Sequence, residues 1–224
     1  MSTSATRAEI ESYATYVLRN KIRCELPFCL VCNTQPTSFK RHQARPRKFR
    51  IRCDMLVQLA LCLVIRWKCP GCNKTFTQQP PFALSRKRFT RETILDTSGY
   101  YLEDEASTYR KAVLEEGAEI FYASTTKEDT PGYKTLNHST PYRWISSLGG
   151  FKEILRYAQD VILQKDPAST VCRDLAALEI APQKYVKAAR EGVLKRCRQL
   201  IHLEAKFRAT FHASIFPFFA TSCA

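Results

Sequence analysis

Two cysteine pairs decide the fold of this chain: residues 29–32 read Cys-Leu-Val-Cys, and residues 69–72 read Cys-Pro-Gly-Cys. A Cys-x-x-Cys pair on a tight turn points both sulfur atoms to one side, so two pairs can surround one tetrahedral zinc ion. We therefore predict one structural Zn²⁺ held by Cys29, Cys32, Cys69 and Cys72. Four thiolates leave no position for a water molecule, which favours a structural over a catalytic ion.

The segment between the two pairs is long. It holds 36 residues, whereas a zinc-ribbon loop usually has roughly 15 to 20. That length accommodates two strands, so we interpret the segment as a zinc ribbon with an elongated hairpin. Two alternative ligands stay open, because Cys24 precedes the first pair closely and His42 lies within the hairpin.

The hairpin has clear strand patterns. Phe49 and Ile51 alternate with Lys48, Arg50 and Arg52, which predicts a half-exposed strand with one basic face. The apolar run over residues 56–67, rich in β-branched residues near its end, predicts a second strand that leads into the second cysteine pair. Phe76 fits a strand that leaves that pair.

Positive charge is concentrated in and beside the hairpin. Residues 20–91 contain sixteen Lys or Arg and two acidic residues, whereas residues 92–131 contain three Lys or Arg and ten acidic residues. A focused basic field suggests a polyanion, and nucleic acid is the usual one. The alternative is a solvated charge run. The predicted phosphate contacts are Lys40, Arg41, Arg45, Arg47, Lys48, Arg50, Arg86, Lys87, Arg88 and Arg91.

The rest of the chain predicts helices. Apolar residues recur at helical spacing over 8–20, 91–103, 107–123, 139–148, 151–165, 169–180 and 183–211. The fold class is therefore α+β, a small ribbon domain followed by a mostly helical region. We divide the chain into an N-terminal helix (1–22), a zinc ribbon (23–80), a helix-turn-helix-like region (81–150) and a helical C-terminal region (151–224). The last helix is long enough to serve oligomerisation or an internal core.

The helix over 139–148 has the composition of a DNA-recognition helix. Ser139 or Thr140 can cap it, Pro141 suits its first turn, and Gly149-Gly150 can end it. In helix-turn-helix proteins the N-terminal residues of the second helix reach base edges. The residues predicted to do so are Ser139, Thr140, Tyr142 and Arg143. An ordinary capped helix with a buried Trp144 is the alternative.

Two stretches together resemble a known family. Trp67-Lys-Cys-Pro-Gly-Cys-Asn-Lys-Thr-Phe-Thr, the connector Pro80-Pro81-Phe82 and the basic Arg86-Lys-Arg-Phe resemble the zinc-ribbon region at the start of bacterial insertion-sequence transposases. They also resemble an uncharacterised family with a ribbon and a helix-turn-helix, and the segment from Ser139 to Gly150 is similar to its second helix. The resemblance covers roughly residues 27–150. It implies a transposase-derived or transposon-associated protein that recognises duplex DNA.

The chain departs from that family in three places. The loop between the cysteine pairs is long, residues 124–137 insert a polar spacer, and the region after residue 150 is too short and too helical for a ribonuclease H-like catalytic core. We therefore expect a protein that is not an enzyme. Two other functions stay open: an adaptor whose aromatic C-terminal tail docks on a recombinase, and an RNA-binding protein whose Phe39, Phe49 and Trp67 stack on bases.

The sequence also bears on location and assembly. The N-terminus has no apolar signal-peptide core, and the longest apolar run, residues 59–65, is far below the ~20 residues of a membrane span. We expect a cytoplasmic, nucleoid-associated protein with no membrane partner. Its expected partners are duplex DNA and either a second copy of the chain or a recombinase.

Overall fold

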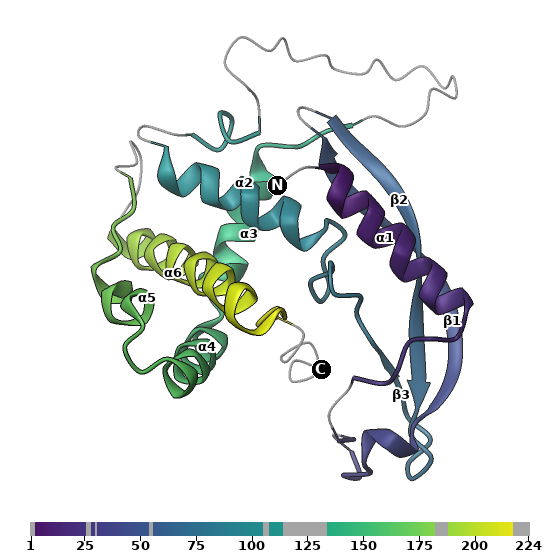
Figure 1. Ribbon diagram of the computed structural model, residues 1–224. Helices are drawn as coiled ribbons and strands as arrows, with labels where there is room; N and C mark the ends of the chain where they lie inside the picture. Colours follow the sequence, from purple (N-terminus) through teal and green to yellow (C-terminus); the bar gives the residue numbers. More distant parts are fainter. Residues whose placement is uncertain are drawn as a thin grey trace, which may run out of the picture. The chain divides into compact units, whose positions relative to one another are not determined.

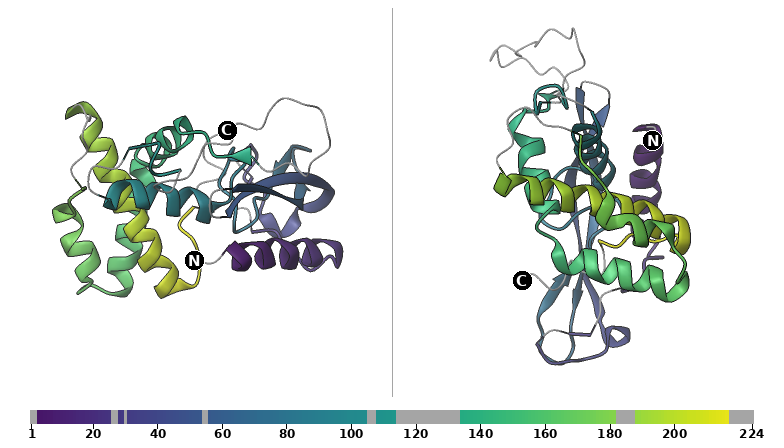
Figure 2. Two further views of the ribbon diagram at one scale, coloured as in Figure 1. Left: turned by 90° about the horizontal axis from the view of Figure 1, so that it is seen from above. Right: turned by 90° about the vertical axis from the view of Figure 1, so that its left-hand side faces the viewer.

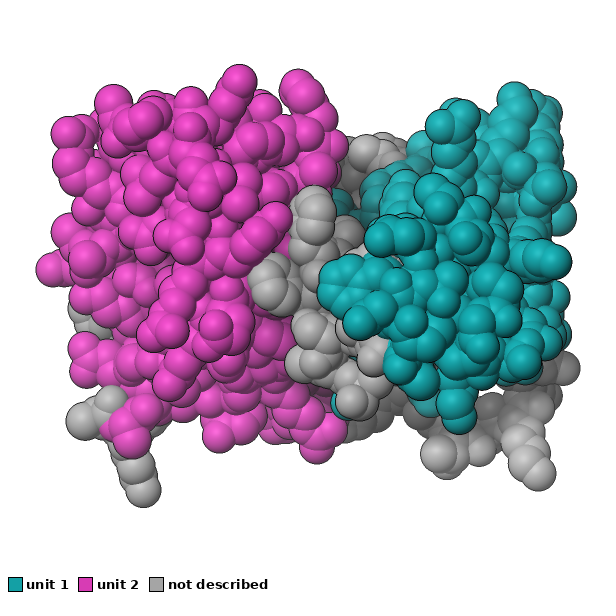
Figure 3. All heavy atoms as spheres, turned by 90° about the horizontal axis from the view of Figure 1, so that it is seen from below, with its two compact units in different colours: residues 1–53, 58–92, 217–224 teal, residues 54–57, 93–216 magenta. Residues whose placement is uncertain are grey.

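The structure is a computed structural model that describes residues 3–25, 28–29, 31–53, 56–104, 108–113, 134–181 and 188–216. It has the predicted α+β fold class. The chain divides into two compact units, shown in different colours in Figure 3. Unit 1 comprises residues 1–53, 58–92 and 217–224, and unit 2 comprises residues 54–57 and 93–216.

Unit 1 is built on the predicted hairpin. The strands β1 (Lys40–Cys53) and β2 (Leu56–Lys68) are hydrogen-bonded neighbours. The short β3 (Thr75–Thr77) adds to β2 in antiparallel register, with Trp67 opposite Phe76. All three strands lie where the sequence predicts them. The 3₁₀ turn η1 (Pro36–Ser38) connects the first cysteine pair to β1.

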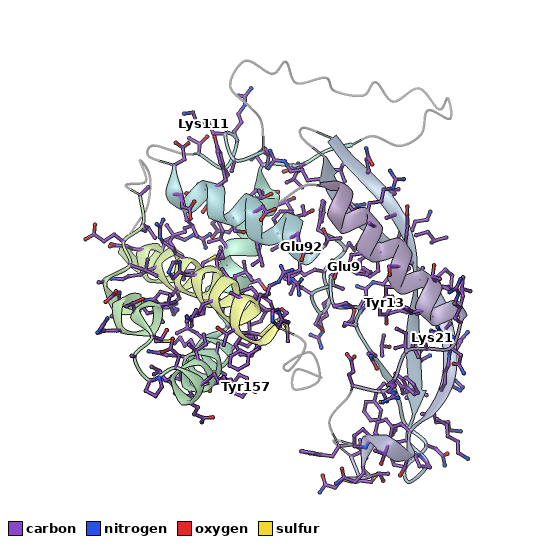
Figure 4. The ribbon with its side chains drawn as sticks, in the orientation of Figure 1. Glu9, Tyr13, Lys21, Glu92, Lys111 and Tyr157 are labelled. Atoms are coloured by element: carbon purple, nitrogen blue, oxygen red, sulfur yellow. The ribbon has the colours of Figure 1, made fainter. Side chains whose placement is uncertain are left out.

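One face of this sheet is covered by the N-terminal helix α1 (Thr3–Leu18), as the two orientations in Figures 1 and 2 show. The helix buries Ile10, Tyr13 and Val17 against the sheet. Tyr13, labelled in Figure 4, meets Phe82 edge to face with ring centroids 5.8 Å apart. The buried apolar area of unit 1 is thus one helix stripe against a narrow sheet.

Unit 2 is helical. Its helices are α2 (Arg91–Glu103, in unit 2 from Thr93 on), α3 (Ser139–Leu148), α4 (Lys152–Lys165), α5 (Thr170–Arg173), the 3₁₀ turn η2 (Asp174–Ala177) and α6 (Ala188–Phe211). A two-residue strand β4 (Lys134–Thr135) pairs antiparallel with Leu56 and Val57 at the start of β2. The long α6 contacts α3, α4 and α5 and forms the core of the unit (Figure 1).

The apolar face of α6 is filled within unit 2. Leu194, Cys197, Leu200 and Leu203 have no exposed surface, and Phe207 is also buried. The α6 side chains also complete the ends of other helices, whose last carbonyls lack partners within their own helix. Arg196 donates to the carbonyl of Gly149 after α3 (2.8 Å), and Arg198 donates to Leu102 of α2 (3.1 Å). The α6 helix is therefore an internal core element, one of the two roles its length allowed.

A glycine permits the close contact of α3 with α6. A Cβ atom at Gly149 would lie 2.3 Å from the carbonyl oxygen of Val193, a distance that no side chain tolerates. The Gly149–Gly150 pair thus ends α3, as expected, and also lets its C-terminus rest on the α6 backbone.

The predicted helices differ from the observed ones in four places, the first being α1, which runs from Thr3 to Leu18 where a helix over 8–20 was expected. Residues 108–113 form turns where a helix over 107–123 was expected, and residues 114–123 lie outside the described residues. The helix expected over 169–180 is the short α5 followed by η2. The start of the helix expected over 183–211 also lies outside the described residues, and α6 is described from Ala188.

The expected domain boundaries differ from the observed units as well. Residues 81–92 belong to unit 1, because the backbone of Arg50 in β1 exchanges hydrogen bonds with Arg88 and Thr90. No boundary falls at residue 150, since α6 packs on both α3 and α4 and keeps residues 93–216 in one unit.

Candidate metal centre and basic surface

The four predicted cysteine ligands come together at the open end of the hairpin. Their sulfur atoms all lie within 4.8 Å of one another, and the Sγ atoms of Cys29 and Cys72, like those of Cys32 and Cys69, are 3.5 Å apart. Bonds of 2.3 Å from a tetrahedral metal ion require sulfur atoms about 3.8 Å apart. The cluster therefore has the dimensions of a four-thiolate metal site.

The two halves of the cluster share one pattern of backbone hydrogen bonds. The amide of Cys29 donates to the carbonyl of Thr34 (2.8 Å), and the amide of Cys69 donates to the carbonyl of Lys74 (2.9 Å). The amides of Asn33 and Asn73 bond back to the carbonyls of Cys29 and Cys69. These turns need a left-handed residue, which asparagine adopts more readily than most, and Asn33 and Asn73 have φ of 56° and 59°.

The two asparagines are functional residues that the sequence reasoning missed. A detectable signal was present, because both pairs continue as Cys-x-x-Cys-Asn. The repeated asparagine marks two equivalent knuckles, each of which points its two sulfur atoms at the same centre.

Hydrogen bonds to sulfur prepare the cluster for ionisation. Hydrogen bonds from the Thr34 side chain and backbone lower the pKa of Cys32. Burial opposes ionisation of Cys69, but hydrogen bonds from the Cys72 backbone and the Thr34 side chain outweigh it and lower its pKa to about 6. The Lys74 backbone favours the Cys72 thiolate, yet burial and the other three thiols raise its pKa to about 12. Ionisation is thus favoured at Cys32 and Cys69, and a bound cation would favour the thiolate form of the other cysteines.

A buried glutamine positions the first knuckle relative to the sheet. Gln78 is 4% exposed and accepts hydrogen bonds from the indole of Trp67 (2.8 Å) and from the amide of Glu25 (3.1 Å). Its own amide group donates to the carbonyl of Arg23 (3.2 Å). A side chain just after β3 thereby fixes the segment that leads to Cys29.

The alternative ligands do not join the cluster. In the part of the chain that the structure describes, the group able to hold a metal ion consists of the four expected cysteines. Cys24 packs against the apolar core of unit 1, and His42 is exposed on β1.

The predicted phosphate-binding residues fall into three groups by exposure. Exposed residues are Lys40, Arg45, Lys48, Arg86 and Arg88, and half-buried residues are Arg41, Arg47, Arg50 and Lys87. The half-buried arginines have partners within unit 1. Arg41 bonds to Asn20 and to the carbonyl of Val17, Arg47 bonds to Gln79 and to the carbonyl of Lys87, and Arg50 stacks over Phe89.

Arg91 forms the third group and has to be removed from the phosphate-binding set. It is 3% exposed, and its guanidinium group is paired with the carboxylate of Glu92. The sequence placed it in a basic arm, but in the structure it begins α2 inside the protein, so it cannot reach a phosphate. Glu92 is labelled in Figure 4.

The helix α3 has the predicted bounds, with a different cap. The N-cap position is His138 rather than Ser139 or Thr140, and its side chain makes no cap hydrogen bond. Asn137, just before it, accepts hydrogen bonds from the amide (2.9 Å) and the hydroxyl (2.8 Å) of Ser139. Tyr142 and Arg143 are exposed, whereas Ser139 and Thr140 are half-buried. Trp144 is buried, as the alternative interpretation required.

The connection of α3 to its neighbours differs from the expected one. The three residues 149–151 join α3 to α4, the length of the turn in a helix-turn-helix unit. The described helix before α3 is α2, which ends at Glu103. Among the described residues, α3 is thus the first helix of a tightly connected pair, not the second.

No family model, curated protein or solved structure matches this chain in comparisons with known proteins. Within the described residues, no helix has the length and apolar character needed to cross a membrane.

Proposed function

We propose that this protein is a zinc-ribbon protein that binds duplex DNA through the basic side of its hairpin. The observation that carries the proposal is the combination of a four-cysteine metal cluster with exposed cations on the adjacent strand. The cluster joins the two strands at the open end of the hairpin, and the hairpin presents Lys40, Arg45 and Lys48 to solvent. Cations held on a rigid element are suited to phosphate contacts along a backbone.

The chemistry of the cluster supports zinc as the metal. Four cysteine sulfurs in tetrahedral spacing are the ligand set of structural zinc sites. When bound, the ion supplies folding energy to unit 1 and no reaction. Substituting Co²⁺ and recording the visible absorption spectrum would identify tetrahedral thiolate coordination.

Exposure narrows the set of residues that we propose for phosphate contact. We assign phosphate contact to the exposed residues Lys40, Arg45, Lys48, Arg86 and Arg88. Because Arg41, Arg47 and Arg50 have partners within unit 1, we assign them a structural role in supporting this surface. Two parts of the proposal rest on the sequence patterns alone. One is the readout of base edges from α3 by Tyr142 and Arg143, and the other is an origin in, or association with, transposons.

The decisive experiment measures affinity of the zinc-loaded full chain for duplex DNA over a salt series. Neutralising about six phosphates gives a log–log slope of about −5. The triple variant Lys40→Gln, Arg45→Gln and Lys48→Gln should flatten the slope by about 3 units. A matched triple variant replaces the exposed Arg110, Lys165 and Arg173 of unit 2 by Gln and should leave the slope unchanged.

Three outcomes would contradict the proposal. If no nucleic acid binds at near-physiological salt, the hairpin faces solvent or a protein partner, and the adaptor function takes first place. If single-stranded RNA binds more tightly than the duplex, the protein is an RNA-binding protein. If both triple variants flatten the slope equally, binding follows total charge and the hairpin has no special role.

A further inference from the structure

Unit 2 contains an arginine–tyrosine stack to which the proposed binding of DNA by the hairpin assigns no role. The guanidinium carbon of Arg190, on α6, lies 3.9 Å from the ring centroid of Tyr142, on α3. Three hydrogen bonds hold that guanidinium group: to the hydroxyl of Ser146 (2.6 Å), to the carbonyl of Tyr142 (3.1 Å) and to the hydroxyl of Tyr109 (3.0 Å). Arg190 is thereby fixed against the ring.

Other aromatic rings fix the position of Tyr142 further. Tyr109 meets it edge to face, with centroids 5.5 Å apart and an interplanar angle of 82°. Tyr109 in turn stacks flat on the buried Tyr101 at 4.3 Å. Despite these contacts Tyr142 is 47% exposed. Since the guanidinium group lies over the ring, the exposed area belongs to the parts of the side chain that Arg190 leaves uncovered.

We propose that Tyr142 is a stacking platform for an unpaired nucleobase. A half-exposed aromatic ring that is already fixed in place loses little conformational entropy when a base stacks on it. A cation held on the covered face draws electron density from the ring and favours stacking of an electron-rich base on the open face. The exposed Arg143, next in sequence, supplies positive charge for the adjoining phosphate.

The inference rests on the proposed function in one respect, because both take nucleic acid as the ligand. It adds a preference that hairpin cations alone cannot produce. Phosphate contacts do not distinguish paired from unpaired nucleotides, whereas a base inside a closed duplex cannot offer its face to a protein ring. The full chain should therefore prefer DNA with a few unpaired bases over the fully paired duplex.

The test compares two probes of equal length and charge: a closed 30-base-pair duplex and the same duplex with a three-base central mismatch bubble. The unmodified protein should bind the bubble at least about fivefold more tightly, the lower end of the contribution of one stacked base. Tyr142→Ala should abolish this preference. Tyr142→Phe should retain it, because stacking needs the ring and not the hydroxyl group.

Controls separate stacking from folding. Tyr100 on α2 is 52% exposed, so Tyr100→Ala removes an equally accessible tyrosine of unit 2 and should retain the preference. Tyr142→Leu keeps an apolar side chain under Arg190 and should lose the preference while keeping the circular dichroism and thermal midpoint of the unmodified protein. Uridine and thymidine oligomers, run in parallel, show whether the unpaired base comes from RNA or DNA.

The proposal is overturned if the unmodified protein binds both probes equally, or if Tyr142→Ala and Tyr142→Phe behave alike. Loss of closed-duplex affinity in Tyr142→Ala would instead place this tyrosine against paired DNA. Failure of the proposed function is distinguishable, because it appears as a closed duplex that does not bind at all, whatever the bubble does.

Discussion

The two basic elements of this molecule, β1 in unit 1 and α6 in unit 2, use their cations differently. On β1, Lys40, Arg45 and Lys48 are exposed. On α6, Arg190, Arg196 and Arg198 donate to groups of unit 2, mostly carbonyl oxygens near other helices. Helix C-termini carry partial negative charge and unpaired carbonyls, so a basic helix packed against them is stabilising. Positive charge in a sequence therefore indicates a polyanion partner only where the fold leaves it exposed.

The largest expected difference between the two units is their dependence on metal. Removing the metal with a chelator, or changing Cys69→Ser, should unfold unit 1, because metal binding supplies folding energy to small metal-held domains. Unit 2 should keep its helices, since none of the four cysteines of the metal cluster lies in it. Far-UV circular dichroism should then retain most of the helical signal, while β-sheet amide resonances disappear.

The control for that experiment is Cys172→Ser, a cysteine of unit 2 that is buried outside the metal cluster. It should leave the metal content unchanged. Equal loss of both units in Cys69→Ser would show that they fold as one cooperative body. Full retention of unit 1 without metal would remove the structural role of the cluster.

A smaller difference concerns leucines. Leu200 of α6 has no exposed surface, so Leu200→Ala should lower the free energy of unfolding by about 2–5 kcal/mol, the usual cost of a core cavity. Leu61 of β2 is 64% exposed, and Leu61→Ala should change it by less than about 0.5 kcal/mol. Urea titration followed by circular dichroism measures both. Similar effects of the two variants would mean that β2 is covered in solution, for example by a second copy of the chain.

The smallest expected effect tests the cations of α6 directly. Arg198→Ala removes one of two donors to the Leu102 carbonyl, which the amide of Ala181 also reaches, and should destabilise unit 2 by about 1 kcal/mol, with no change in the salt slope of DNA binding. Substitution of the exposed Lys48 in Lys48→Gln should leave the stability unchanged and flatten the salt slope of DNA binding by about 1 unit. A flatter slope in Arg198→Ala would show that α6 also contacts phosphates.

The sequence predicted the fold class and the cluster well because both depend on local spacing. Two Cys-x-x-Cys pairs and the two strand patterns between them are enough to specify knuckles and a hairpin. The helix bounds of α2, α3 and α4 followed from apolar periodicity and from Gly149. What could not be predicted depends on which segments meet. Nothing local shows that Arg91 is buried, or that Arg190 reaches Tyr142 from 48 residues away.

The position of the metal cluster within the hairpin has a consequence for its motions. The strands β1 and β2 follow each other directly at one end of the hairpin, where β1 ends at Cys53 and β2 begins at Leu56, and both knuckles lie at the opposite end. An open hairpin end frays first, so backbone amides there exchange with solvent fastest in an unassisted hairpin. A metal ion at that end reverses the gradient. With the ion bound, amides near Lys40 and Lys68 should exchange slowly. Removal of the ion should speed their exchange before that of amides near Cys53 and Leu56.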